Sequence, residues 1–222
     1  MELSDVMRTT AAARAFRPDP IPAEVLYRVL DDARFAPSGG NQQGWHVTIV
    51  RDTALRHRLA DLSAATWARY KAEQAAGFRP FNPINAATAD MPVPDGMPEH
   101  PMLADIESVP ELLVVTVDLA VLAVMDHRLD RFSVIGGASI YPFVHNILLA
   151  ARNQGLGGVL TTFLTASEPE AAPLLHLPDG HAIVAMIGLG VPVHQVTKLK
   201  RNPVEHFATI DTFEGPAFTS AT

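Results

Sequence analysis

The sequence predicts a single domain of mixed helices and strands, on the basis of its length, its pattern and its composition. With 222 residues the chain has room for one sizeable domain, and two full domains would be cramped. Segments with helical spacing alternate along it with short β-branched or unbroken apolar runs. Apolar residues make up 48% and charged residues 18%, which provides side chains for a core and for contacts between subunits. We therefore expect a globular domain that is also able to form an oligomer.

The N-terminal part of the chain predicts a helix, a polar loop, a strand and a second helix, in that order. Apolar residues recur at helical spacing from Pro22, which suits the first position of a helix, to about residue 36. A polar loop at residues 38–41 follows, and the β-branched run 47–50 predicts a strand. The next helix is expected from Thr53 to about residue 70.

The C-terminal half predicts three strands and one long helix. The run 111–117 is apolar with little polar alternation, which indicates a strand covered on both faces. A helix is expected from about Ser139, which would act as its cap, until Gly155 ends it. The remaining strands are expected at residues 159–163 and 182–189.

Two segments depart from this pattern within a single domain that spans residues 1–222. The tail, residues 198–222, has little core-forming pattern and is expected to pack outside the main body. Residues 77–110 hold seven prolines, which predicts a long irregular insert. A solvated surface loop is one interpretation of this insert. A lid over a pocket fits better, because large apolar side chains are costly in water, and the insert holds Phe78, Phe81, Met91, Met97 and Met102.

The charge and residue content exclude several classes of protein. A formal charge of -7 and a pI near 5.7 argue against nucleic acid as a partner, because phosphate binding needs a basic surface. The absence of cysteine excludes disulfides, thiolate metal sites and a cysteine nucleophile. The acidic start does not resemble a signal peptide, and no apolar run is long enough to span a membrane. We expect a soluble cytoplasmic protein without a membrane partner.

Several well-known catalytic and metal-binding signatures are missing or misplaced. The run 155–158 is rich in glycine but joins a helix to a strand, whereas a dinucleotide-binding loop joins a strand to a helix. The residues around Ser139 lack the second glycine of a nucleophile elbow. The histidines show no spacing typical of a metal site. We therefore expect no metal and name no catalytic side chain.

The remaining candidates suit a phosphorylated ligand, which needs cations and free N–H groups. The densest basic positions are Arg8, Arg14, Lys198, Lys200 and Arg201, although each of them taken alone is more typical of a solvated surface charge. The loop 38–41 is able to supply N–H groups where a backbone must approach a ring closely.

The residues of these segments, and the order of the segments along the chain, resemble the nitroreductase family. The resemblance covers nearly the whole chain except the proline-rich insert. The most recognisable run is Ala-Pro-Ser-x-x-Asn-x-Gln-x-Trp, at residues 36–45. The other matching segments are residues 14–22, 146–151 with 155–158, 187–192 and 198–203. The resemblance implies an α+β fold with a central, mostly antiparallel sheet flanked by helices. It also implies an intertwined homodimer with tightly bound FMN at the subunit interface.

The resemblance assigns cofactor-binding roles residue by residue. The loop beside the flavin comprises Pro37, Ser38, Gly39 and Asn41. Gln43 matches a polar position that faces the flavin across the dimer. The segment whose backbone approaches the isoalloxazine ring comprises Leu160, Thr161 and Thr162.

At the FMN phosphate, the residues of this chain match the family pattern less completely. Arg14 matches a basic position near the FMN phosphate, and Lys200 with Arg201 resemble the closing phosphate clamp. Many family members carry Arg-x-Ser where this chain has residues 10–12, Thr-Ala-Ala, and Arg8 is a candidate replacement for the missing arginine.

The resemblance implies that NAD(P)H reduces FMN, and that a nitroaromatic, quinone or activated alkene then takes up the reducing equivalents in a ping-pong exchange. Two alternatives stay open. One is a specialised enzyme of the same fold that cleaves flavin or removes halide from tyrosines. The other is a flavin-binding or storage protein without activity.

Overall fold

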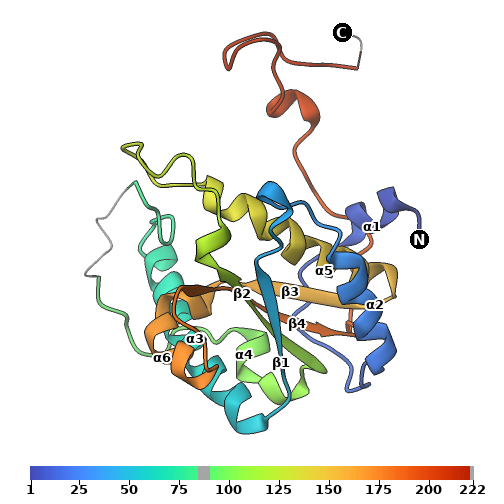
Figure 1. Ribbon diagram of the computed structural model, residues 1–222, viewed down its shortest axis with the longest axis vertical. Coiled ribbons are helices and arrows are strands. Elements are labelled where there is room, and N and C mark those ends of the chain that lie inside the picture. Colours follow the sequence, from blue (N-terminus) through green and yellow to red (C-terminus); the bar gives the residue numbers. More distant parts are fainter. Residues whose placement is uncertain (85–90, 221–222) are drawn as a thin grey trace.

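A four-stranded sheet forms the centre of the molecule (Figure 1). The structure is a computed structural model that describes residues 1–84 and 91–220. The strands pair in the order β1-β2-β4-β3, and each pair is antiparallel. Their bounds are Trp45–Val50 for β1, Glu111–Asp118 for β2, Gly157–Thr161 for β3 and His181–Gly190 for β4. Helices flank this sheet, which confirms the predicted α+β fold.

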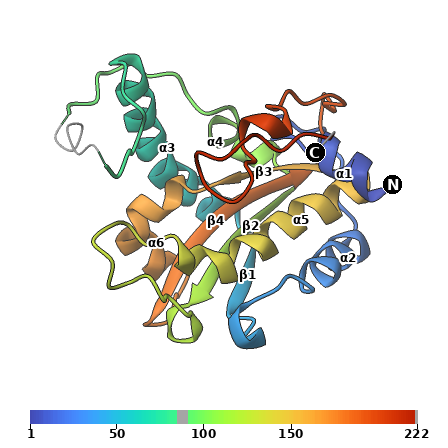
Figure 2. The same ribbon diagram turned by 90° about the horizontal axis from the view of Figure 1, so that it is seen from above.

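Helices α2 (Ala23–Ala33) and α5 (Tyr141–Asn153) cover one face of the sheet (Figure 2). Both follow the predicted apolar pattern, and α5 ends close to Gly155 as expected. Proline occupies an N-terminal position of α5, where its missing N–H leaves no helical bond unmade. The core on this side is built from fully buried side chains, among them Val29, Val144, Ile147, Leu113 and Ile187.

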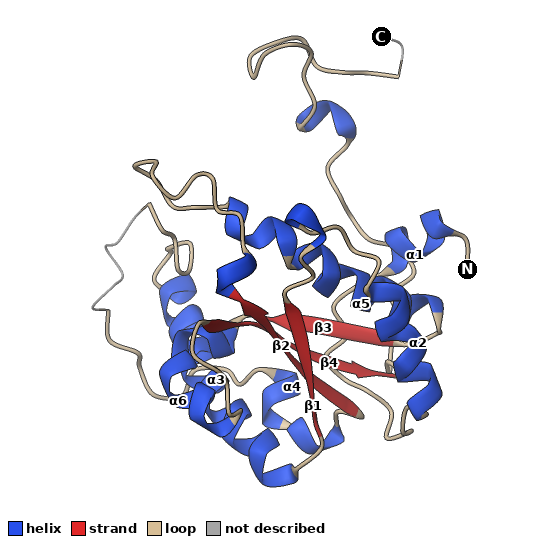
Figure 3. Cartoon of the chain, viewed as in Figure 1, coloured by secondary structure: helices blue, strands red, loops and turns tan. Residues whose placement is uncertain are grey.

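Three helices cover the opposite face, and Figure 3 shows the sheet enclosed between the two helical layers. These helices are α3 (Thr53–Ala75), α4 (Pro101–Ala104) and α6 (Glu168–Leu174). Helix α3 begins at the predicted residue and runs further than the predicted end near residue 70. The second core lies here and contains Leu59, Met102, Ile106, Leu112 and Met186.

Strand β2 lies between β1 and β4 and contributes to both cores. Leu113 and Val115 face α2 and α5, whereas Leu112 and Val114 face α3 and α4. Alternate residues of a strand point to opposite faces, so a sheet covered on both sides needs apolar residues at consecutive positions. This explains the unbroken apolar run and confirms the strand predicted at residues 111–117.

Three features of the chain differ from the sequence-based expectation. Helix α1 (Leu3–Thr9) was not predicted, because it buries only Val6 and so has little apolar periodicity. Helix α6 was not predicted either, because it is short and contains Pro173. Strand β3 ends two residues before the predicted end, because a 3₁₀ turn begins at Phe163.

The proline-rich segment contains a short ordered part. Residues 85–90 of the predicted insert lie outside the described residues. Met102, which was grouped with the apolar side chains of a lid, is 1% exposed and belongs to the second core. Phe78 and Phe81 are exposed, and the lid-like role of the part before α4 stays a prediction.

The tail leaves the main body and projects from it, as Figure 1 shows for the red end of the chain. Up to residue 220, the secondary structure that the tail contains is a 3₁₀ turn at Val204–His206 and an isolated bridge between Thr209 and Ala217. Among the described residues, none of the helices is both long and apolar enough to cross a lipid bilayer.

Candidate functional site

The outer edge of strand β3 is open where the family resemblance predicts a ring-binding backbone. One side of β3 pairs with β4 along its whole length. On the other side, the N-terminal segment makes a bridge between Ala12 and Gly158, with the Ala13 N–H donating to the Gly158 carbonyl at 3.0 Å. Within the described part of the chain, this is the only backbone pairing on that edge. Beyond Gly158, the outer edge of β3 at Leu160 therefore has no backbone partner among the described residues.

Two threonines fix the end of this strand. Thr161 is buried, and its hydroxyl donates to the Met186 carbonyl at 3.3 Å. Thr162 is exposed, and its carbonyl accepts from the N–H and the hydroxyl of Thr165 at 3.1 and 2.7 Å. The open edge thus ends in a turn whose backbone is held by hydrogen bonds.

Arg14 lies next to a buried histidine. The Nε of Arg14 donates to Nε2 of His100 at 3.3 Å, and one terminal nitrogen lies 3.5 Å from the Ala12 carbonyl. His100 is 3% exposed. Burial, and then the charge of Arg14, lower the pKa of His100 from 6.5 to about 4. His100 is therefore neutral at physiological pH and accepts the hydrogen bond that orients Arg14.

Aromatic side chains surround this histidine. The His100 ring meets Trp67 edge-on at 5.0 Å between centroids and Phe163 at 5.7 Å. Phe163 directly follows the exposed Thr162, so the end of β3, His100 and Arg14 belong to one packed unit. His100 comes from the proline-rich segment, which explains why sequence reasoning missed it.

The loop that contains the family run adopts an unusual backbone. Gly40, Asn41 and Gln43 have φ of 58°, 55° and 52°, in the left-handed region that disfavours side chains. The hydroxyl of Ser38 accepts from the Gln43 N–H at 3.0 Å, which closes the loop on itself. Strained backbone of this kind concentrates at functional sites, because the surrounding structure must enforce it.

A serine from a distant part of the chain anchors the same loop. The Gly39 N–H donates to the hydroxyl of Ser139 at 2.9 Å. The predicted cap role of Ser139 is wrong, because the N-cap of α5 is Ile140 and no side chain caps that helix end. The hydroxyl is directed toward the loop instead.

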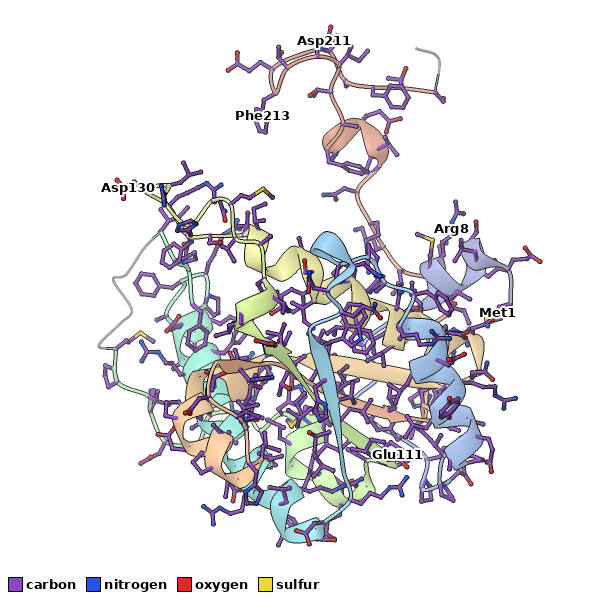
Figure 4. All side chains as sticks on the ribbon, viewed as in Figure 1. Met1, Arg8, Glu111, Asp130, Asp211 and Phe213 are labelled. Atoms are coloured by element: carbon purple, nitrogen blue, oxygen red, sulfur yellow. The ribbon has the colours of Figure 1, made fainter. Side chains whose placement is uncertain are left out.

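The predicted phosphate-binding cations do not meet within one chain. Arg8 lies in the last turn of α1 and is exposed, and Figure 4 shows its side chain directed away from the body. Lys200 and Arg201 are exposed on the tail, where Arg201 donates to the Lys200 carbonyl at 2.8 Å. Within residues 1–84 and 91–220, no hydrogen bond or ion pair links Arg8, Lys200 or Arg201 to Arg14.

In the described parts of the chain, no group of three or more His, Asp or Glu residues has a geometry that could hold a metal ion.

Comparison with known proteins places these features in a family. The family model described as "Nitroreductase family" matches residues 7–191. A nitrobenzene nitroreductase from Ectopseudomonas oleovorans is 25% identical over 225 residues, which cover 93% of this chain and 96% of that protein. A 5,6-dimethylbenzimidazole synthase from Rhodobacter capsulatus is 32% identical over 201 residues, which cover 86% of this chain and 83% of the synthase.

Solved structures share the fold. An NADPH:FMN oxidoreductase from Vibrio harveyi, complexed with NAD⁺, superposes with a TM-score of 0.68 at 21% identity and covers 96% of this chain and 78% of its own. An iodotyrosine deiodinase bound to FMN and 3-iodo-L-tyrosine superposes with a TM-score of 0.65 at 23% identity. The match covers 95% of this chain and 100% of the deiodinase chain. By the extent of the family match, the chain belongs to the nitroreductase family.

Proposed function

We propose that this chain is an FMN-dependent oxidoreductase that passes reducing equivalents from NAD(P)H to a small electrophilic acceptor. The acceptor classes we propose are nitroaromatics, quinones and activated alkenes, and we propose the cytoplasm as the site of action. The observation that carries the proposal is the open edge of β3 at Leu160 to Thr162, next to the segment that carries Arg14, in a member of this family.

The chemistry of the available groups fits a flavin phosphate. The open edge offers backbone N–H and C=O groups, which suit the polar edge of an isoalloxazine ring. Arg14, Lys200 and Arg201 offer cations for a phosphate. When bound, FMN supplies the hydride-transfer chemistry.

The protein's own contribution is electrostatic and positional. Arg14 holds a positive charge at the site, and the neutral ring of His100 fixes its orientation. A fixed cation and backbone N–H groups stabilise negative charge without reorganising during the reaction. The anchored backbone of Thr161 keeps the open edge in place. This division of roles requires no acid–base pair, in agreement with the lack of a catalytic signature in the sequence.

A homodimer would complete the site. The tail carries aromatic residues in water: Phe213 is 98% exposed and points out from the tail in Figure 4, and Phe207 is 72% exposed. Exposed apolar segments of this kind mark interaction surfaces. We propose that each tail packs on the partner subunit and brings Lys200 and Arg201 to the partner's cofactor. Sedimentation equilibrium should then give twice the 23.9 kDa mass of one chain, and a mass of one chain would contradict the dimer.

The proposed activity predicts a flavin spectrum and sustained turnover. Purified protein should show the absorption bands of oxidised flavin, and these bands should bleach when NADH or NADPH is added without oxygen. Addition of a nitroaromatic or a quinone should restore them, because the acceptor withdraws the reducing equivalents. Absence of flavin bands, with no FMN binding and no restored activity on addition, would contradict the proposal. Bound flavin without turnover would support a storage protein.

Removing the two tail cations is predicted to weaken FMN retention. The double variant Lys200→Ala with Arg201→Ala should raise the Kd for FMN by about tenfold or more, because charge-assisted phosphate contacts each contribute about 1.5–3 kcal/mol. Gel filtration followed by flavin absorbance measures the retained fraction. Arg58→Ala removes an exposed cation from α3 and serves as a control. Equal retention in the double variant and the wild type would remove both residues from the site.

A second candidate function is a reaction that consumes flavin. It is favoured by the 32% identity to a 5,6-dimethylbenzimidazole synthase. Reduced protein exposed to oxygen with excess FMN distinguishes the two functions. Loss of FMN with appearance of a new aromatic product would favour the second function, and full recovery of FMN would favour the reductase. A similar assay for halide release from a halotyrosine tests the dehalogenating alternative.

A further inference from the structure

A small cavity with mostly apolar walls and a few polar groups lies where the N-terminal segment meets the start of β3. Its walls include Thr10, Gly158, Gln195 and Arg152. The cavity volume is about 20 Å³, which is room for about one water-sized group. It is therefore too small for a ring system and suits the oxygen of a small anionic group.

Arg152 brings an uncompensated positive charge to this cavity. It lies in the last turn of α5 and is half-buried, and its Nε donates to the Thr9 hydroxyl at 3.0 Å. Within the described residues, no ion pair neutralises Arg152, and its two terminal nitrogens have no hydrogen-bond partner. The donors that remain free are those that match a phosphate best.

The other described walls of the cavity carry no negative charge that would oppose an anion. Gln195 donates to the Thr9 carbonyl at 3.1 Å and to the Val196 carbonyl at 2.8 Å, which fixes the wall opposite α5. His194 also lines the cavity, and none of the described residues around it is acidic.

The cavity lies at the point where this sequence departs from the family pattern. Its lining includes Thr10 and the two alanines after it, which stand where many family members carry Arg-x-Ser. Small side chains at these positions leave space that Arg152 reaches from α5. Arg8, the replacement suggested by the sequence, does not line the cavity and points outward (Figure 4).

We propose that Arg152 is a further cation that binds the phosphate group of FMN in this chain, in place of the arginine missing from the N-terminal segment. This inference rests on the proposed function, because it assumes that FMN is the ligand. The alternative is a purely structural role, in which Arg152 ties α1 to the end of α5 through Thr9 and complements the helix dipole.

Comparison of FMN with riboflavin separates the two roles, since riboflavin carries the same ring without the phosphate. Dissociation constants are measured by flavin fluorescence quenching on apoprotein. Arg152→Ala should raise the Kd for FMN by about ten- to a hundredfold and leave the Kd for riboflavin within twofold. Thr9→Val, which removes the hydrogen bond but keeps the charge, should leave both constants within twofold. Arg28→Ala removes an exposed arginine of α2 and is the matched control.

Each other outcome overturns the inference. An equal loss of FMN and riboflavin affinity in Arg152→Ala would assign the residue a structural role. A selective loss of FMN affinity in Arg8→Ala, with Arg152→Ala unchanged, would assign the phosphate to Arg8. If the wild-type protein binds neither flavin, the proposed function itself fails; if it binds FMN and Arg152→Ala binds it equally well, only the role of Arg152 fails.

Discussion

Replacement of Arg56 by methionine is expected to lower the free energy of unfolding by about 3–5 kcal/mol. Arg56 lies on α3, is 8% exposed, and donates to the carbonyls of Val50 and Val109 at 2.8 and 2.6 Å and, more weakly, to that of Pro110 at 3.4 Å. These carbonyls lie where β1 ends and β2 begins. Methionine keeps the apolar stem and removes every donor, so the buried carbonyls lose their partners.

Loss of the Arg56 charge adds to the free energy of unfolding that the substitution removes. Burial lowers the pKa of Arg56, and the carboxylate of Glu111 opposes that shift. Glu111 is 6% exposed, one of its oxygens has no partner among the described residues, and Arg51 is 3.6 Å from the other. Without Arg56, the exposed Arg51 is the one cation that pairs with the buried carboxylate among the described residues.

Urea unfolding of the apoprotein measures the effect, because bound FMN would add its own stabilisation. Arg58→Met removes an exposed arginine from the same helix and should change the free energy of unfolding by less than about 0.5 kcal/mol. The loss of unfolding free energy in Arg56→Lys should lie between those of Arg58→Met and Arg56→Met, because one ammonium group cannot reach three carbonyls with the geometry of a guanidinium. A loss below about 1 kcal/mol in Arg56→Met would show that the carbonyls find other partners.

Arg56 also illustrates what sequence patterns do and do not predict. Leu55, Leu59 and Leu62 recur at helical spacing along α3, and these residues pack on the second core. An arginine between them is typical of a solvated face. Its burial is decided by three carbonyls, two of which lie more than fifty residues away along the chain. Local periodicity carries no information about such a partner.

The fold as a whole was more predictable than the site. Strand β2 and helix α5 were predictable because their sequences have dense apolar patterns. The local structure that these patterns favour is the one that the sheet and its two cores require. The proline-rich segment was described as irregular, yet it supplies Met102 to the core and His100 to the site. Short elements with few apolar residues give a weak pattern, so their packing emerges only in three dimensions.

The site was predictable in its backbone parts. The run from Ser38 to Gln43 forms a loop as expected, although its left-handed conformation at two non-glycine residues has no signature in the composition. The arrangement of the proposed phosphate-binding cations could not be derived from the sequence, because Lys200 and Arg201 lie on a tail whose position no local pattern predicts. Arg152, the phosphate ligand that we propose, was not singled out from the sequence, because a basic residue in the last turn of a helix is ordinarily explained by the helix dipole.

Acidification is expected to destabilise the protein through His100. Its pKa is about 4 in the folded state against 6.5 without the fold, so the unfolded chain binds more protons between these values. The stabilisation is complete above pH 6.5 and is lost progressively as the pH falls toward 4. The shift of about 2.5 pKa units corresponds to a loss on the order of 3 kcal/mol, because each unit contributes about 1.4 kcal/mol.

The variant His100→Phe isolates this contribution. Phenylalanine keeps a ring beside Trp67 and Phe163 but does not titrate. At pH 7 the variant should be less stable than the wild type or equal to it, since Arg14 loses its acceptor. Between pH 7 and pH 4.5 the wild type should lose roughly 2–3 kcal/mol more than the variant, as measured by urea unfolding of the apoproteins. Carboxylates titrate in both proteins and cancel in this difference, and the exposed His145→Gln should behave as the wild type does. Equal losses of unfolding free energy in the wild type and His100→Phe would mean that protonation of His100 does not destabilise the fold. Such a result would contradict the role of His100 as a neutral acceptor for Arg14.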